Sequence, residues 1–229
     1  MKNMTILPSS ISFLNDLAIN NNRDWFNDNK ETYLEAQSNI IFFVDQLIVL
    51  MNGHDAIENT SAKKSLYRIY NDVRFSKDKA PYKPRFAFSL QRATKLKRGG
   101  YYMNIQPGNN FLACGFFSPN PEDLKRIRKD IELHPADWRK ILNAKPIKDN
   151  FVALAGNKVP TFPKGFPKDH EAIDLIRHKQ FILRHNFTDQ EILEPTFVYK
   201  VNDIFKTVRH FFDHLSLVLT TDLNGEIKI

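Results

Sequence analysis

The chain has 229 residues, with 33 Lys or Arg against 26 Asp or Glu, and its formal net charge is +7. Apolar residues make up 42% and include 19 Phe, which excludes a disordered chain and allows a substantial core. The single cysteine excludes a disulfide scaffold and any zinc site built from several cysteines. There is no internal repeat, so we expect residues 1–229 to form a single domain, with 157–168 as the one candidate boundary.

The N-terminal stretch MKNMTILPSS lacks the apolar run of a secretory signal. The most apolar stretch, Ile40 to Met51, is interrupted by Asp45 and Gln46. It is also shorter than the roughly 18 to 20 residues that span a bilayer. We therefore interpret it as a buried core helix and expect a cytoplasmic protein without a membrane partner.

Helical signals dominate the first fifty residues. Ser9 or Ser10 can cap a short helix, and Asn22 can cap a second one. From Glu31 to Met51 the apolar residues recur at helical spacing, which predicts a longer helix.

The middle of the chain is typical of antiparallel strands. Its short aromatic and β-branched runs are separated by Pro, Gly and Asn residues that favour turns. These runs are Leu66–Tyr70, Arg85–Leu90, Tyr101–Ile105 and Phe111–Phe117, and Phe181–Leu183 can add a further strand.

Helical patterns return after the strands. Asn120 and Pro121 can begin one helix, Pro135 to Asn143 predicts another, and Asp169 to Arg177 a third. The C-terminal part carries an apolar stripe of helical spacing from Ile204 to Leu219. Together these patterns predict an α+β fold in which a central antiparallel sheet is flanked by N-terminal and C-terminal helices.

Positive charge is concentrated in residues 61–100. This segment holds twelve basic and two acidic residues, a net +10, so the other 189 residues carry −3 of the total +7. A concentrated cationic segment on a near-neutral body indicates an anionic partner. The alternative is a solvated face, which we favour for Lys95 to Arg98 because they precede Gly99-Gly100 and resemble a hairpin tip.

The densest set of polar residues lies between positions 68 and 83. If the strand continues, its period of two places Asp72 between Arg68 and Arg74, where a carboxylate can orient guanidinium groups toward phosphate or carboxylate oxygens. We predict an anion pocket here, with Tyr82 contacting the ligand. The predicted ligand-binding residues are Arg68, Arg74, Lys77, Lys79 and Lys83. The alternative is a salt-bridge network on the sheet with a solvated basic loop.

This block resembles the signature of a bacterial and fungal family catalogued as a domain of unknown function. The signature reads Arg, two variable, Arg-Asp, one variable, Arg-Phe, three variable, Lys, one variable, Pro-Tyr, two variable, His. The matching residues are Arg68, Asp72, Arg74, Phe75, Lys79, Pro81 and Tyr82. Asn71 and Arg85 depart from the signature, which has Arg and His at these positions. Asn22–Phe26, Gly100–Tyr102 and Pro163–His170 also resemble the family, and the resemblance implies no particular activity.

The candidates for acid–base catalysis, should the protein be an enzyme, are Asp72, Tyr82 and His170. For His170 we favour a role at a helix start. His210 and His214 are four residues apart, but no partner at a telling spacing supports a metal site. The sequence names no cofactor, because phosphate-binding loops, dinucleotide fingerprints and nucleophile elbows are all missing from it.

Two functions from different classes follow. The favoured one is a pocket for a phosphorylated or carboxylated small molecule. The alternative is a nucleic-acid-binding surface in which basic and aromatic side chains alternate. Exposed aromatic residues would favour nucleic acid, and buried ones would favour the pocket.

Overall fold

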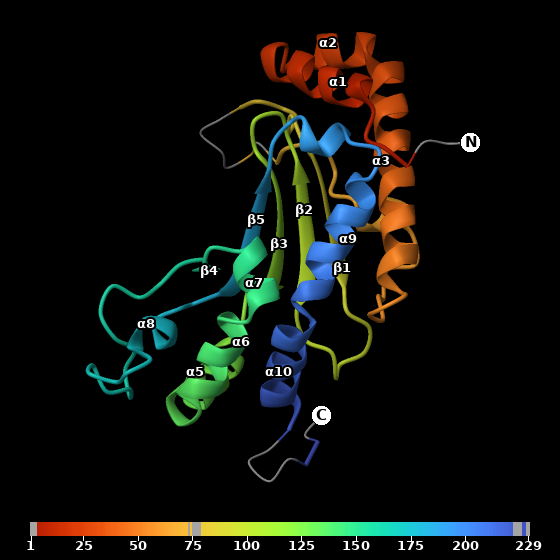
Figure 1. Cartoon of the computed structure of the whole chain (residues 1–229). Coiled ribbons are helices and arrows are strands. Elements are labelled where there is room, and N and C mark those ends of the chain that lie inside the picture. The colour runs from red at the N-terminus through yellow and green to blue at the C-terminus, as the bar shows by residue number, and fades with distance from the viewer. Residues whose placement is uncertain (1–3, 73, 75–78, 222–225, 228–229) are drawn as a thin grey trace. The chain divides into compact units, whose positions relative to one another are not determined.

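The computed structural model describes residues 4–72, 74, 79–221 and 226–227. Within these residues, ten α-helices and a five-stranded antiparallel sheet form an α+β fold with helices before and after the strands (Figure 1). The predicted fold class is therefore confirmed.

The N-terminal helices are α1 (Pro8–Ile19), α2 (Arg23–Asp28), α3 (Lys30–Met51) and α4 (Ala62–Ser65). The strands are β1 (Phe86–Gln91), β2 (Gly100–Ile105), β3 (Asn110–Phe116), β4 (Leu154–Ala155) and β5 (Phe181–Phe187). The later helices are α5 (Pro121–Leu133), α6 (Pro135–Leu142), α7 (Lys145–Asn150), α8 (Ile173–Ile176), the 3-10 helix η1 (Glu191–Leu193), α9 (Phe197–Thr207) and α10 (Arg209–Thr220).

The strands lie in the order β1-β2-β3-β5-β4. The first three are successive in the chain, as the turn residues between them predicted. β4 pairs with β5 in antiparallel register, with Leu154 opposite Leu183. Phe86, Phe88 and Leu90 of β1 are all buried, which confirms the face assigned to them by alternation.

The chain divides into two compact units, each made of distant segments. Unit 1 comprises residues 1–90, 102–112 and 186–203, and unit 2 comprises residues 91–101, 113–185 and 204–229. The loop at 157–168 lies inside unit 2 and does not separate the units. Single-domain organisation stays a prediction.

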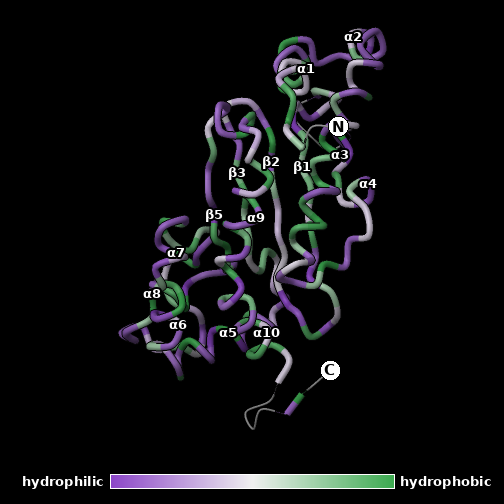
Figure 2. Tube along the Cα trace, turned by 45° about the vertical axis from the view of Figure 1, so that its right-hand side comes forward, coloured by the Kyte–Doolittle hydropathy of each residue, from purple (hydrophilic) through white to green (hydrophobic). Residues whose placement is uncertain are grey.

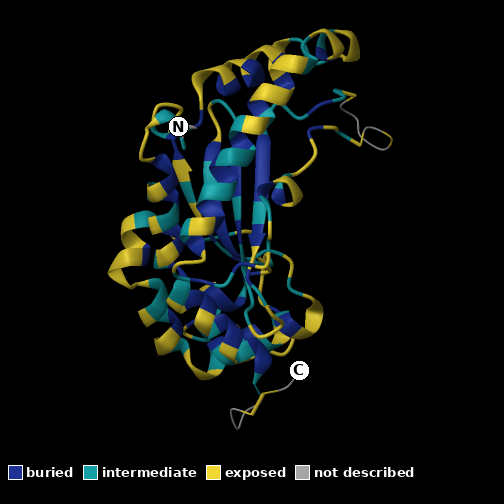
Figure 3. Cartoon of the chain, turned by 90° about the vertical axis from the view of Figure 1, so that its right-hand side faces the viewer, coloured by how far each residue is buried: buried dark blue, intermediate teal, exposed yellow. Residues whose placement is uncertain are grey.

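The core of unit 1 is organised around α3, which packs on α1 and α4. Aromatic rings join α3 to its neighbours: Phe43 lies 5.8 Å from Phe197, and Tyr33 lies 6.5 Å from Phe86, centroid to centroid. In Figure 2 the tube of the strands is largely green, whereas that of α2 is mostly purple. The helices show buried and exposed stripes in Figure 3, as expected for amphipathic helices on a core.

Helix α3 is long and apolar enough to cross a membrane by length and composition alone. This is weak evidence for a span, because the core helix of a soluble protein passes the same test. Ile40, Val44 and Leu47 are fully buried within the protein, which agrees with the predicted core helix. The cytoplasmic location stays a prediction.

In unit 2, α5 packs on α6, α8 and α10. Trp138 of α6 is fully buried, with its ring 5.8 Å from Phe181 and 6.3 Å from Phe211. Cys114 on β3 is also fully buried, and burial raises the pKa of its thiol, as expected for a structural cysteine.

Four elements differ from the prediction. Helix α1 begins at Pro8 with Leu7 at the N-cap and has no side-chain cap, and the Ser10 hydroxyl donates to Asn39 instead. The C-terminal stripe is divided at Val208 between α9 and α10. The helix predicted from Asp169 is reduced to the single turn of α8. Leu66–Tyr70 forms isolated bridges instead of a strand.

Glu191 provides a test of electrostatic stabilisation in unit 1. Its carboxylate accepts from Lys200 Nζ at 2.7 Å and from the Thr188 N–H at 2.7 Å, which lowers its pKa to about 2. We expect Glu191→Gln to lower the free energy of unfolding by about 1 kcal/mol at pH 7, since these partners are partly exposed. Because the folded pKa lies below the ordinary value of 4.5, this contribution is complete above that value and is lost as the pH falls toward 2.

The measurement is urea unfolding of wild type and variant between pH 7 and pH 3. Glu194→Gln, an exposed neighbour, is the control and should show a much smaller difference at pH 7. A Glu191→Gln difference that does not shrink in acid would contradict the assignment.

Candidate functional site

The predicted pocket segment forms a hairpin in unit 1. Residues 66–71 run antiparallel to residues 81–88, with bridges from Leu66 to Phe88 and from Tyr70 to Tyr82. Three backbone hydrogen bonds hold the two arms together: Tyr67 N–H to Ala87 O, Lys83 N–H to Ile69 O, and Asn71 N–H to Pro81 O. The hairpin therefore places Tyr70 directly opposite Tyr82.

Asp72 and Arg74 form an exposed ion pair on this hairpin. Arg74 donates from Nε at 2.9 Å and from Nη2 at 2.7 Å to the two carboxylate oxygens of Asp72. These hydrogen bonds lower the pKa of Asp72. In the described part of the chain Asp72 makes no ion pair with Arg68, so it orients one arginine and not the two expected.

The other predicted ligand-binding cations are spread along the hairpin. Arg68 and Lys79 are exposed, and Lys83 is half-buried with Nζ 3.4 Å from the Arg68 carbonyl oxygen. Lys77 lies outside the described residues. A basic patch on the hairpin and the anion-binding roles of these residues stay predictions.

Tyr82 is the best-anchored of the predicted site residues. Its ring stacks on Phe26 of α2 with centroids 3.9 Å apart and an angle of 14° between the planes. The Asn21 side chain donates to the Tyr82 carbonyl oxygen at 2.9 Å and accepts from its N–H at 3.1 Å. Tyr82 is consequently 4% exposed and fixed to the start of α2.

Further aromatic residues and one lysine surround the Tyr82 ring. Tyr70 lies 5.4 Å from Tyr82, and Tyr33 lies 5.1 Å from Phe26, centroid to centroid. Lys30 Nζ lies 5.0 Å from the Phe26 ring and 4.9 Å from the Tyr33 ring, distances that allow cation–π attraction. We name this set, Phe26, Lys30, Tyr33, Tyr70 and Tyr82, the tyrosine cluster.

The polar atoms of the tyrosine cluster are mainly donors. Burial raises the pKa of Tyr33 and of Tyr82, and the Tyr70 phenol raises both further, so both hydroxyls keep their protons at neutral pH. The charge of Arg23 opposes the upward shift of the Tyr82 pKa. Lys30 Nζ donates to the Tyr70 hydroxyl at 3.3 Å, and Gln37 donates to the Tyr33 hydroxyl at 2.6 Å.

A second polar group of unit 1 lies on the face of the sheet opposite Phe86 and Phe88. Arg85 is half-buried there and donates from Nη1 to the Tyr102 hydroxyl at 3.3 Å and to Asn104 Oδ1 at 3.0 Å. The Tyr67 ring lies 6.1 Å from the Tyr102 ring, and its hydroxyl lies 3.4 Å from Ser89 Oγ. We name this set, Tyr67, Arg85, Ser89, Tyr102 and Asn104, the Arg85 face.

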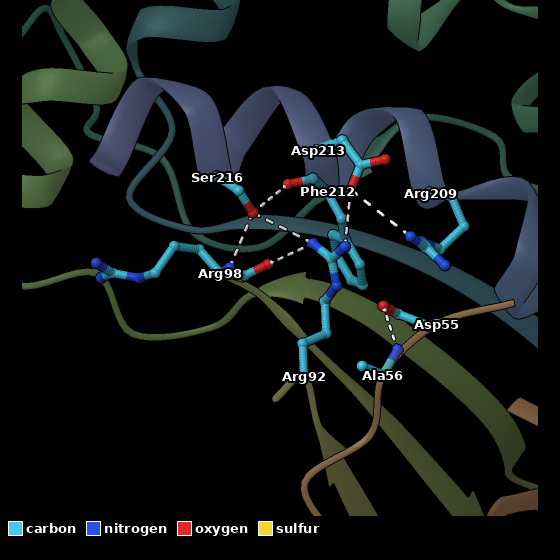
Figure 4. A network of polar contacts seen from close by, with 8 residues as sticks. All are labelled: Asp55, Ala56, Arg92, Arg98, Arg209, Phe212, Asp213 and Ser216. Carbon is cyan, nitrogen blue, oxygen red and sulfur yellow. Dashed lines mark hydrogen bonds and ion pairs between the residues drawn. The ribbon is translucent and has the colours of Figure 1, made fainter. Parts of the chain in front are cut away.

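The remaining arginines of the basic segment belong to the core of unit 2. The Arg92 side chain is fully buried and donates to Asp213 at 2.7 Å, to Ser216 Oγ at 3.2 Å and to the Arg98 carbonyl oxygen at 3.2 Å (Figure 4). Arg98 pairs with Asp123. Gly99, with φ of +93°, has no room for a Cβ beside the Phe212 ring, so this turn requires glycine. These arginines serve stability and are not available to a ligand.

His170 lies in unit 2, whereas Asp72 and Tyr82 lie in unit 1. Its Nδ1 accepts from the Ala172 N–H at 3.1 Å, so its Nε2 carries the proton and donates to the Glu132 carbonyl oxygen at 3.2 Å. Both ring nitrogens are therefore used in holding the chain before α8. A catalytic role for His170 stays a prediction.

His214 has a structural setting as well. Its Nε2 lies 3.1 Å from Asp130, which also accepts from Trp138 Nε1 at 2.7 Å. Among residues 4–72, 74, 79–221 and 226–227, no group of three His, Cys, Asp or Glu side chains could hold a metal ion.

Comparison with known proteins now identifies the family. The model of the conserved hypothetical protein family DUF2461 matches residues 9–214. The chain belongs to the DUF2461 family. No curated protein and no solved structure matches it significantly. The predicted resemblance to a family of unknown function is confirmed, and two of the segments that carried it, Asn22–Phe26 and Pro81–Tyr82, meet where Tyr82 stacks on Phe26.

The sequence patterns did not indicate Lys30 or the contacts that Arg85 makes. Lys30 belongs to the cluster only because α3 begins beside the hairpin, a contact that no local spacing predicts. Arg85 was noted as a departure from the family signature, but its partners Tyr102 and Asn104 depend on the register of β2. Alternation in β2, which places 102 and 104 on one face, was the signal available.

The buried arginine of unit 2 can be tested directly. Replacing Asp213 by Asn removes the carboxylate that pairs with Arg92 and leaves a buried cation less compensated. We expect a loss of about 2 kcal/mol in the free energy of unfolding, measured by urea denaturation. Lys95→Ala, in the same basic segment but exposed, should change it by less than about 0.5 kcal/mol. Equal effects of the two variants would contradict a structural role for Arg92.

Proposed function

We propose that this DUF2461 protein binds a small molecule that carries a phosphate or carboxylate group, with the anionic group held at the tyrosine cluster and Arg23. The observation that supports this proposal is a concentration of hydrogen-bond donors for which the described residues supply no acceptor. Whether a reaction follows binding is not part of the proposal.

The donors without an acceptor among the described residues are on Lys30, Tyr70, Tyr82 and Arg23. An ammonium group has three N–H donors, and Lys30 uses one of them, on Tyr70. The Tyr70 hydroxyl accepts that bond and keeps its own proton to donate. The Tyr82 hydroxyl and the Arg23 guanidinium make no hydrogen bond within the described residues, and no described carboxylate pairs with Lys30 or Arg23.

Such a group of donors fits an oxyanion with several acceptor oxygens. Hydrogen bonds to a charged group are stronger than those between neutral groups, and two cations beside protonated phenols favour negative charge. The aromatic rings reduce the exposure of the site to water and so strengthen these interactions. Tyr82 thus keeps the ligand contact assigned to it from the sequence, now through its hydroxyl.

The hairpin cations have a supporting role in this proposal. Arg68, Arg74, Lys79 and Lys83 raise the positive potential around the cluster and attract an anionic ligand. Asp72 keeps Arg74 extended along the hairpin. As acid–base catalysts, Asp72, Tyr82 and His170 stay predictions.

One observation favours the alternative, a nucleic-acid-binding surface. Tyr67 and Tyr70 are 54% and 50% exposed on this basic hairpin and offer rings on which bases can stack. Tyr82 and Tyr101, in contrast, are buried and cannot stack on a base. The experiment below distinguishes the two functions.

Tyr82→Phe is the sharpest variant, because it keeps the ring that stacks on Phe26 and removes only the hydroxyl. The measurement is a thermal-shift and titration series at one fixed ionic strength with phosphate, sulfate, sugar phosphates, nucleotides, dicarboxylates and short RNA and DNA oligomers. We expect stabilisation by a small anion and an affinity about tenfold lower in Tyr82→Phe. Lys30→Met should weaken binding at least as much.

Tyr199→Phe is the matched control, since Tyr199 is an exposed tyrosine of the same unit, and it should bind like wild type. Stabilisation by oligomers alone, lost as salt increases, would replace the proposal with the nucleic-acid function. Binding of small anions that is identical in wild type, Tyr82→Phe and Lys30→Met would reject the tyrosine cluster as the site.

A further inference from the structure

The two described hydrogen-bond acceptors of Arg85, on the Arg85 face, are uncharged. Asn104 is fully buried and donates from Nδ2 to the Asn109 carbonyl oxygen at 2.8 Å, which turns its Oδ1 toward Arg85. Oδ1 and the Tyr102 hydroxyl then hold Nη1 of Arg85 at 3.0 and 3.3 Å. The guanidinium is therefore fixed in direction by two uncharged acceptors, and its charge is not neutralised by them.

The other edge of the Arg85 guanidinium, formed by Nε and Nη2, indicates which kind of ligand Arg85 can bind. Within the described residues, Nε and Nη2 of Arg85 donate to no acceptor, and no carboxylate forms an ion pair with it. Arg74 shows what this edge does when an acceptor is present: its Nε and Nη2 donate side by side to both oxygens of Asp72, at 2.9 and 2.7 Å. Two parallel N–H groups match the two coplanar oxygens of a carboxylate.

Aromatic rings surround Tyr102, whose hydroxyl accepts from Arg85 Nη1. The Tyr102 ring lies 6.1 Å from the Tyr67 ring and 5.8 Å from the Phe111 ring, and Tyr67 is 54% exposed. The Tyr67 hydroxyl donates to Ser89 Oγ at 3.4 Å. A ligand body resting here would meet ring surfaces and few charges, which favours a flat, apolar body.

We propose that the Arg85 face is a second binding site, specific for an aromatic monocarboxylate, with the carboxylate on Nε and Nη2 of Arg85 and the ring of the ligand against Tyr67 and Tyr102. One cation with one bidentate edge matches a single negative charge, whereas a phosphate group would leave oxygens without donors. The site shares no residue with the tyrosine cluster, so it stands independently of the function proposed above.

The test is calorimetric titration of the full chain with four probes: benzoate, the neutral isostere benzamide, the non-aromatic cyclohexanecarboxylate, and inorganic phosphate. We expect benzoate to bind most tightly, cyclohexanecarboxylate more weakly, and benzamide not measurably. Phosphate should not compete with benzoate. Benzoate affinity should fall at least tenfold in Arg85→Gln and also in Arg85→Lys, because lysine keeps the charge but lacks the bidentate edge.

Two further variants keep the test decisive if an Arg85 variant folds poorly. Tyr67→Leu changes an exposed residue and should reduce the preference for benzoate over cyclohexanecarboxylate with little effect on the melting temperature. Tyr199→Phe, an exposed tyrosine of the same unit outside both proposed sites, should leave benzoate binding unchanged. The proposal is overturned if benzoate fails to bind wild type, if Arg85→Gln binds it as well as wild type, or if phosphate displaces it at equal concentration.

Discussion

The stack of Tyr82 on Phe26 is the contact on which the organisation of unit 1 depends. Tyr82 belongs to the hairpin that borders β1, and Phe26 belongs to α2, so this contact joins the second helix to the hairpin beside the sheet. Asn21 reinforces it by pairing with both backbone groups of Tyr82, much as a neighbouring strand would. Because the ring stack and the two hydrogen bonds from Asn21 converge there, the Tyr82 ring is held in one orientation.

The same stack decides which side chains become neighbours. It brings the start of α3, with Lys30 and Tyr33, against Tyr70 of the hairpin. Lys30 then lies over aromatic rings, where its charge is stabilised without a carboxylate. A cation held by rings keeps its N–H donors for another acceptor, which an ion-paired lysine does not.

The arginines of the basic segment, residues 61–100, have three different settings in the structure. Arg92 and Arg98 are consumed in ion pairs of unit 2, and Arg74 is balanced by the exposed Asp72. Among the described residues, Arg85 is held by neutral acceptors alone. Net charge does not distinguish these arginines. Of the four, only Arg85 has Nε and Nη2 without an acceptor among the described residues. Composition therefore shows where the cations are concentrated in the chain and does not show which of them are paired with carboxylates.

Local signals predicted most of the fold. Asn22 and Asn120 cap their helices as expected, since a capping side chain bonds to a backbone N–H only three residues away. The turns between β1, β2 and β3 were equally local. Leu66–Tyr70 did not form a strand, although its residues favour one, because strand formation depends on a continuous partner and this hairpin offers only separate bridges.

The sites depend on contacts that sequence patterns do not encode. Arg92 and its partner Asp213 are 121 positions apart, and Asn21 and Tyr82 are 61 apart. The predicted Asp72–Arg74 contact is present, although these residues lie outside the strands, and the predicted contact with Arg68 is not among the described ones. What distinguishes a binding arginine from a structural one is whether a carboxylate from elsewhere in the fold reaches it. Only the packing of the folded chain determines this. Here Lys30 and Arg85 have more N–H donors than the described residues have acceptors for them.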